Sequence, residues 1–293
     1  MEELKIPNSQ PSIPNDLNSS KLSKIDTLIL SGGSILGLTY LGLFQKISES
    51  FPNFLNGINE FYGTSIGAVV SVFFAMGFQP QELFDSLGDI SIEPNIDILH
   101  FTSTFGLDSG DSAIDFLVKI LQSKCSENIR ELTLDKFFQL TNKTVNITTC
   151  CAENGEVVIL SHKTFPNLKL VHALRMTISI PIYFTPVIWK GKHYIDAGVT
   201  LNFPFKPEFY SKENVLGVNL QRKFSSDDTL NIFSYISNVI SLVVAQKPEK
   251  SDNIITLVIP PSVKNKEIYN FNVSPELKKK LFNIGYSYIL TSK

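Results

Sequence analysis

The chain has 293 residues, of which 43% are hydrophobic and 18% are charged, which is enough to bury the core of one large α/β domain. A formal net charge of −2, without a run of Lys or Arg, argues against a nucleic-acid partner. The three cysteines include no CxxC pair, which argues against a structural zinc site and is typical of free thiols in a reducing compartment.

The N-terminal segment, residues 1–21, is rich in Asn, Ser and Pro and lacks the apolar stretch of a signal peptide. We expect it to be a polar arm, disordered in part, on a cytoplasmic protein. Residues 22–293 show neither an internal repeat nor a linker, so we expect one domain there.

The first third of the domain contains two strand-turn-helix patterns, and the turn of the first is rich in glycine. Residues 61–78 are nearly uncharged and almost long enough to span a membrane. Three glycines and a sharp turn interrupt them, however, so a buried strand, a turn and a buried helix explain them better. We expect strands at 26–30 and 60–62, and helices at 36–48, 66–76 and 80–87.

Strands and helices continue to alternate along the rest of the chain, which predicts a mainly parallel sheet covered on both faces. We expect residues 105–110 to be a loop, and residues 181–186, which begin and end with proline, to have no regular structure. The expected helices are 111–122, 134–140, 170–177, 230–244 and 275–289, and the expected strands are 144–150, 156–160, 187–189, 193–195, 215–220 and 254–259.

A G-x-S-x-G motif stands at the second strand-to-helix turn, formed by Gly63, Thr64, Ser65, Ile66 and Gly67. In a nucleophile elbow the serine sits on a strained turn with its hydroxyl exposed, and the glycines let neighbouring backbone pass closely. Ser65 is therefore a candidate nucleophile for acyl transfer, a reaction that also needs donors for the developing oxyanion. The alternative is a buried structural turn.

The glycine-rich turn after the first strand contains Gly32, Gly33, Ser34 and Gly37. Its amides could hold an anion at the start of a helix. The dinucleotide-binding pattern G-x-G-x-x-G fails because Ser34 replaces a glycine, and a Walker loop fails because no Gly-Lys-Ser/Thr follows. An oxyanion hole fits better beside a nucleophilic serine.

No histidine has a recognisable triad context as the base for Ser65; the four are His100, His162, His172 and His193. Asp196 is the better candidate, because it ends an apolar strand and is followed by Ala197 and Gly198, small residues that allow close approach. The alternative is an ordinary turn, in which Asp is common.

Together, the glycine-rich turn, the elbow about thirty residues later and the late Asp-Ala-Gly resemble the patatin-like phospholipases. The segments 175–187 and 194–204 look like the family's stretches before and around its catalytic aspartate, and 105–110 is similar to the loop before its mid-domain helix. The resemblance runs from about residue 25 to 289.

The resemblance implies a three-layer α/β/α fold with a mainly parallel central sheet, and a Ser-Asp dyad without histidine. Asp196 would then take the Ser65 proton directly or through water, and amides of Gly32, Gly33 and Ser34 would form the oxyanion hole. The implied protein is a phospholipase A-type lipid acyl hydrolase that works through an acyl-serine intermediate, on phospholipid or another acyl lipid.

Two positions depart from the family's pattern: Ser34 replaces a third glycine, and Leu36 replaces a frequent Arg or Lys. They motivate an alternative, a non-catalytic lipid-binding or scaffold protein on the same fold. A lipid acyltransferase that uses the same acyl-enzyme is a further alternative.

Transient contact with a membrane surface would need an apolar mouth, and candidate residues for it are Ile98, Leu99, Phe101, Tyr183 and Phe184. The alternative is that they are core residues. No calcium-binding loop is visible, so neither a metal nor another cofactor is implied. An unidentified protein activator is a further possible partner.

Overall fold

The computed structural model describes residues 19–87, 98–209, 212–222, 251–268 and 271–288, together with Tyr235 and Val239. Most of the expected polar arm, nearly all of the helix expected at 230–244 and the last residue of the helix expected at 275–289 lie outside the described residues.

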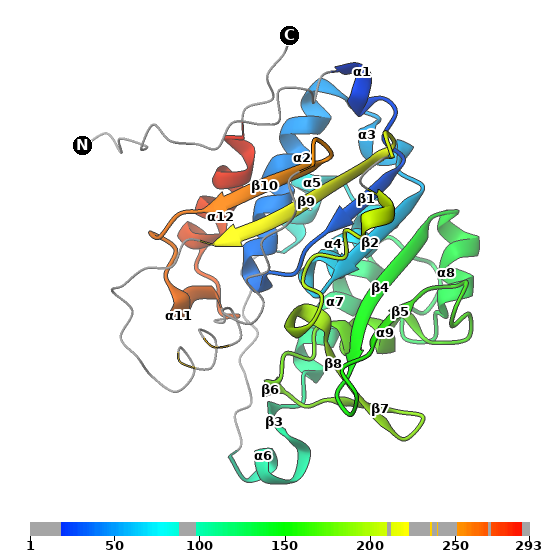
Figure 1. The fold of residues 1–293 in the computed structure, drawn as a ribbon, viewed down its shortest axis with the longest axis vertical. Coiled ribbons are helices and arrows are strands. Elements are labelled where there is room, and N and C mark those ends of the chain that lie inside the picture. Colours follow the sequence, from blue (N-terminus) through cyan, green and yellow to red (C-terminus); the bar gives the residue numbers. More distant parts are fainter. Residues whose placement is uncertain are drawn as a thin grey trace.

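Within the described chain, eight strands form a central sheet in the order β10-β9-β1-β2-β4-β8-β7, with β5 also paired to β4 (Figure 1). The strands from β10 to β4 run parallel, whereas β5 and β8 are antiparallel to β4 and β7 is antiparallel to β8. This confirms the mainly parallel sheet. The strands are β1 (Thr27–Leu30), β2 (Glu60–Thr64), β4 (Thr144–Cys151), β5 (Val157–Leu160), β7 (Val187–Trp189), β8 (Lys192–Asp196), β9 (Val215–Arg222) and β10 (Ile254–Ile259).

Helices flank this sheet. Residues 61–78 form β2, the turn at Ser65 and α4, and no helix of the described chain combines the length and apolar character needed to cross a membrane. The α-helices are α1 (Ser19–Leu22), α2 (Leu38–Ser50), α3 (Phe54–Gly57), α4 (Ile66–Ala75), α5 (Pro80–Ser86), α6 (Ile98–Thr104), α7 (Asp111–Gln122), α8 (Leu134–Thr141), α9 (Leu170–Thr177), α11 (Asn265–Ile268) and α12 (Pro275–Tyr286), and the 3-10 helices are η1 (Ser34–Gly37), η2 (Ala197–Val199) and η3 (Pro207–Phe209).

Side chains of β1 alternate between the two faces of the sheet, as the period of a strand requires. Leu28 and Leu30 belong to the large core cluster with residues of α2, α4, α9 and α12. Ile29 points to the other face, where Phe205 and Phe209, the latter in η3, pack against it. Both faces of β1 are therefore buried, which explains its continuous apolar sequence.

Helix α12 lies directly against α2 (Figure 1). Two glycines allow this contact: a Cβ on Gly42 would lie 1.9 Å from the carbonyl oxygen of Phe282, and one on Gly285 would lie 1.8 Å from that of Thr39. The two helices thus touch backbone to backbone, as small residues permit.

Two expectations about irregular structure were wrong. The segments 105–110 and 181–186 contain the strands β3 (Gly106–Asp108) and β6 (Ile182–Phe184), which pair in parallel as a separate two-stranded sheet. Pro181 and Pro186 lie just outside β6, so the ladder does not need their missing N–H groups.

Candidate active site

Ser65 stands at the sharp turn between β2 and α4, with φ 53° and ψ −127°. A positive φ is uncommon for serine, and this is the conformation that a nucleophile elbow imposes. The motif glycines are required sterically, because a Cβ on Gly63 would lie 2.4 Å from the Ala68 nitrogen and one on Gly67 would lie 2.5 Å from the Leu30 carbonyl oxygen.

Two threonines hold the elbow. The N–H of Ser65 donates to Oγ1 of Thr177 over 2.9 Å, and that hydroxyl donates to the Thr148 carbonyl over 2.6 Å. The buried Thr177, from the end of α9, therefore fixes the backbone of Ser65 against β4. Such bonds offset the cost of the strained turn.

Asp196 ends β8 opposite Thr149 of β4, and its N–H donates to the carbonyl of Ser179 over 2.9 Å. Its buried carboxylate accepts a hydrogen bond from the Gly198 N–H over 2.7 Å. Burial raises the pKa of Asp196 to about 6, and its interactions with the Ser65 side chain and the Gly198 N–H counteract only part of that effect. The structure thus brings together the two residues that the sequence singled out from positions 131 apart.

The glycine-rich turn lies beside Ser65. A Cβ on Gly32 would lie 3.3 Å from the Cβ of Ser65, so the backbone there approaches the serine closely. The N–H of Gly32 donates to the Asn202 carbonyl over 2.9 Å, which joins the turn to the segment after Asp196. Gly37 is packed against Ile66 at the start of α4, since a Cβ there would lie 2.3 Å from Cγ1 of Ile66.

The two residues that depart from the family's pattern have different surroundings. Ser34 adopts φ 52°, a conformation that favours glycine, and its hydroxyl donates to the Ile268 carbonyl over 2.7 Å. The side chain of Leu36 is buried in the core. The serine thus keeps a backbone shape suited to glycine, and the leucine replaces a charge with core packing.

Ser65 lines a cavity of about 130 Å³ whose exposed lining is apolar. The helices α2, α4, α5 and α7 provide most of the wall, and the segment 178–184 closes one side. The lining residues are Ser34, Ile35, Gly37, Leu38, Leu41, Ser65, Ile66, Val69, Val70, Phe73, Leu83, Leu87, Ala113, Phe116, Leu117, Ile178, Ile180, Phe184 and Phe271. An apolar chain attached to a reacting ester would fit such a wall.

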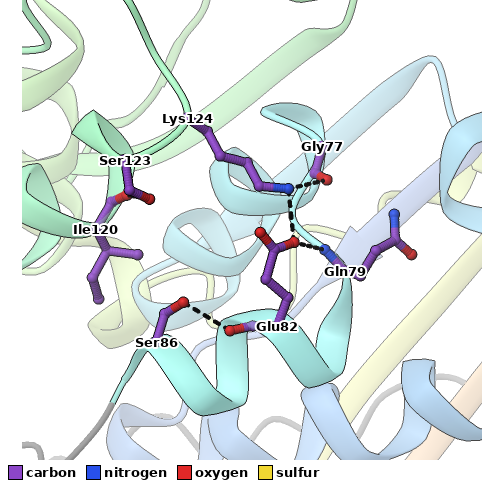
Figure 2. Close-up of polar contacts among 7 residues, drawn as sticks. All are labelled: Gly77, Gln79, Glu82, Ser86, Ile120, Ser123 and Lys124. Atoms are coloured by element: carbon purple, nitrogen blue, oxygen red, sulfur yellow. Dashed lines mark hydrogen bonds and ion pairs between the residues drawn. The ribbon is translucent and has the colours of Figure 1, made fainter.

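Polar contacts hold two helices of that wall together (Figure 2). The ammonium of Lys124, just after α7, donates to the Gly77 carbonyl over 2.9 Å and to the Glu82 carboxylate of α5 over 2.7 Å. Glu82 also accepts from the N–H of Gln79 over 3.1 Å, which caps α5. These contacts join α5 to the end of α7, and both helices line the cavity.

Arg175 of α9 holds the other side of the site. Its guanidinium donates to the carbonyls of Ser109 and Thr185 and to the hydroxyl of Ser179. Burial lowers the pKa of Arg175 to about 10, so it stays charged at neutral pH. Since the carbonyl of Ser179 also accepts the Asp196 N–H, Arg175 supports the segment on which Asp196 rests.

The histidines whose side chains are described lie in other surroundings. His193 contacts Glu153 over 2.7 Å, and His162 stacks on Phe138. Burial lowers the pKa of both His162 and His172. Among the described residues, none of these three is hydrogen-bonded to Ser65 or Asp196, and no group of His, Cys, Asp or Glu could hold a metal ion.

The expected apolar mouth is only partly exposed. Phe184 is buried, and Tyr183 is half-buried against Phe184 and Phe271. Phe101 is half-buried as well, and the side chains of Ile98 and Leu99 lie outside the description. For Phe184 the alternative, a core residue, is correct.

Sequence reasoning missed Thr177, Asn202 and Arg175 as parts of the site. Thr177 is 112 residues from Ser65, and nothing near either residue in the sequence pairs them. The one local signal is the polar character of Thr177 at the end of an apolar helix, where a buried hydroxyl needs a partner.

The sequence profile of the patatin-like phospholipases matches residues 28–209, more than half of the chain. A probable lipid hydrolase of Invertebrate iridescent virus 6 is 30% identical over 200 residues, which cover 64% of this chain and 65% of that protein. The 1-acylglycerol-3-phosphate O-acyltransferase Pnpla3 of Mus musculus is 26% identical over 184 residues, which cover 61% of this chain and 40% of that protein. The chain thus spans less than two thirds of either relative.

Among solved structures, VipD from Legionella pneumophila has the same fold, with a TM-score of 0.54 and 17% identity. The superposition covers 90% of this chain and 66% of VipD. At this level of identity the likeness concerns the arrangement of helices and strands.

Proposed function

Because the chain belongs to the patatin-like phospholipase family, we propose that it is a lipid acyl hydrolase whose nucleophile is Ser65 and whose base is Asp196. The observation that carries this proposal is that the Ser65 side chain interacts with the buried Asp196 carboxylate and also lines an apolar cavity. A serine and its base alone would allow hydrolysis of any ester, and the apolar cavity is what points to a lipid substrate.

In the proposed first step, the Asp196 carboxylate takes the proton of the Ser65 hydroxyl, and Oγ of Ser65 attacks the carbonyl carbon of an acyl ester. We assign the oxyanion to the amides of Gly33 and Ser34, because the amide of Gly32 already donates to Asn202. The tetrahedral intermediate collapses, the alcohol leaves with the proton from Asp196, and acyl-Ser65 remains.

In the proposed second step, Asp196 takes a proton from water, and the hydroxide attacks acyl-Ser65. Collapse releases the fatty acid, and the proton returns to Ser65. A base with a pKa of about 6 is ionised at neutral pH and yet more basic than an ordinary carboxylate, which suits both proton transfers.

The cavity supports a lipid substrate. Its apolar wall begins at Ser65 and runs between α4, α5 and α7, so the acyl chain of the substrate would lie along it while the ester carbonyl stays at the serine. The proposed reaction is therefore of the phospholipase A type.

Labelling and lipid hydrolysis together test the function. Wild type is expected to release fatty acid from phospholipid vesicles and to react with a fluorophosphonate probe, and Ser65→Ala is expected to do neither while remaining folded. Ser71→Ala is the matched control, because Ser71 lies in α4 behind the elbow and should keep both properties. Undiminished hydrolysis by Ser65→Ala would refute the proposal, and binding of lipid without labelling or hydrolysis by wild type would favour the scaffold alternative.

The acyltransferase relative favours a second candidate reaction, in which an alcohol replaces water at acyl-Ser65. Product analysis with added lysophospholipid distinguishes the two. Formation of diacyl lipid that exceeds fatty-acid release would assign the protein to transfer.

A further inference from the structure

Three large apolar side chains are exposed close to the elements that line the cavity. Phe105 is 60% exposed, Ile182 37% and Ile188 68%. Scattered exposed hydrophobic residues are ordinary, so the significance of these three depends on whether they form one surface. We call Phe105, Ile182 and Ile188 the rim patch.

Backbone pairing and one ring contact join the three residues. Phe105 directly precedes Gly106, which pairs with Ile182 between β3 and β6. The ring of Phe105 lies edge-on to the ring of His193, with 6.1 Å between centroids, and His193 is opposite Ile188 between β7 and β8. Figure 1 accordingly shows α6, β3, β6 and β7 together at one end of the molecule.

Two residues of the rim patch have an unfavourable backbone conformation. Phe105 has φ 61° and Ile182 has φ 72°, in the left-handed region that bulky and β-branched residues avoid. Such conformations persist only where the surrounding structure enforces them, and they gather at functional sites. Here they accompany apolar side chains that are partly exposed to solvent.

One residue of the rim patch lies in a segment that lines the cavity. Ile182 lies between Ile180 and Phe184, which both line it. The segment that contributes to the cavity lining therefore also carries part of the patch.

Positive charge lies beside the patch. Lys190 and Lys192 are exposed in the hairpin between β7 and β8, next to Ile188, and neither forms an ion pair with a described residue. The nearby carboxylate of Glu153 is engaged by His193. Exposed apolar side chains flanked by lysines are the combination that binds an anionic bilayer surface.

We propose that the rim patch, with Lys190 and Lys192, docks the protein on an anionic phospholipid bilayer and turns the cavity mouth towards the lipid. This inference rests on the proposed function and deepens it, because it names the surface from which the substrate is taken.

Binding is measured without hydrolysis in a Ser65→Ala background. Trp189 is the single tryptophan of the chain and lies in the hairpin, so energy transfer from it to a dansyl-labelled lipid reports docking. The vesicles are phosphatidylcholine alone or phosphatidylcholine with phosphatidylglycerol, and co-sedimentation gives the partition coefficient independently.

The double variant Phe105→Ser/Ile188→Ser is expected to lower the partition coefficient about tenfold or more, since it removes two apolar side chains from the interface. Lys190→Gln and Lys192→Gln are each expected to weaken binding to phosphatidylglycerol vesicles about fivefold, and to leave binding to phosphatidylcholine unchanged. Leu140→Ser is the matched control, because Leu140 is 51% exposed on α8.

Unchanged vesicle binding by the double variant, or an equal loss in Leu140→Ser, would overturn the docking surface. Self-association that disappears in the double variant would assign the patch to a second copy instead. Hydrolysis of a water-soluble ester separates this proposal from the proposed function. If no ester is hydrolysed, the catalytic proposal fails and the vesicle data still decide the docking surface.

Discussion

Titration of Asp196 should control the pH dependence of hydrolysis. Burial raises the pKa of its carboxyl from the ordinary 3.8 to about 6, and only the ionised form can accept the Ser65 proton. With a pKa of about 6, about nine tenths of the carboxyl is ionised at pH 7 and about one tenth at pH 5. We therefore expect kcat/KM to fall about tenfold between these two values.

The same shift affects stability, in the opposite direction. Because the pKa in the folded state exceeds that of the unfolded chain, the folded state binds the proton more tightly. This stabilisation is fully present below the unfolded pKa and is lost as the pH rises through about 6. The difference corresponds to about 3 kcal/mol, at about 1.4 kcal/mol for each pKa unit. Asp196→Asn should consequently be inactive, yet more stable than wild type at pH 8 by up to that amount.

The assay follows release of butyrate from a soluble ester by chromatography, so that detection does not depend on pH, while circular dichroism verifies that the protein is folded at each point. Urea unfolding at pH 4 and pH 8 gives the stability difference, which should nearly vanish at pH 4. Glu153→Gln removes a carboxylate outside the site and should leave the inflection unchanged. An inflection near pH 4, or an Asp196→Asn variant less stable than wild type at pH 8, would refute the reasoning.

Further predictions concern the elbow and the cavity wall. Thr177→Val removes the acceptor of the Ser65 N–H and should lower kcat about tenfold or more with little change in KM. Thr177→Ser keeps a hydroxyl there and should retain activity. Steady-state kinetics on a soluble ester measure both variants. Gly67→Ala should lower the free energy of unfolding by about 1–3 kcal/mol, because its Cβ would meet the Leu30 and Ser31 carbonyls, and this outweighs the helix preference of alanine. Gly57→Ala is the control, because a Cβ there has open space and should not lower the free energy of unfolding. Urea unfolding of both variants measures the difference. Leu117→Trp fills the cavity from α7 and should shift the preference to shorter acyl chains by about tenfold in relative kcat/KM. Val118→Trp lies on the same helix but outside the cavity lining, so it should leave the preference unchanged. Equal chain-length profiles for the two variants would contradict the assignment of the cavity to the acyl chain.

Local signals were sufficient for much of the fold. The helix expected at 170–177 and the strand expected at 254–259 have these bounds in the structure, because apolar periodicity and clear boundaries agree there. The strands β3 and β6 were missed since each is three residues long and depends on the other, 76 positions away, for its hydrogen bonds. Short non-local pairs leave no periodic pattern.

The candidate site shows the same division. Ser65 and Asp196 could be proposed because glycines and small residues mark their turns, and the structure places the two side chains together. The bonds that hold them depend on tertiary contacts: Thr177 reaches Ser65 from α9, and Asn202 reaches Gly32 across the sheet end. No local pattern encodes such contacts, so they had to come from the structure.

The contact between α12 and α2 has a consequence for where this protein can be cut. The family match ends at residue 209, yet β9 lies between β1 and β10 in the sheet, and α12 lies on α2 through Gly42 and Gly285. An expression fragment that stops at residue 209 would turn β1 into a sheet edge and uncover the face of the helix that follows the glycine-rich turn. The strands β9 and β10 and the helix α12 therefore belong to the folding unit that carries the site, and fragments for biochemistry should include them.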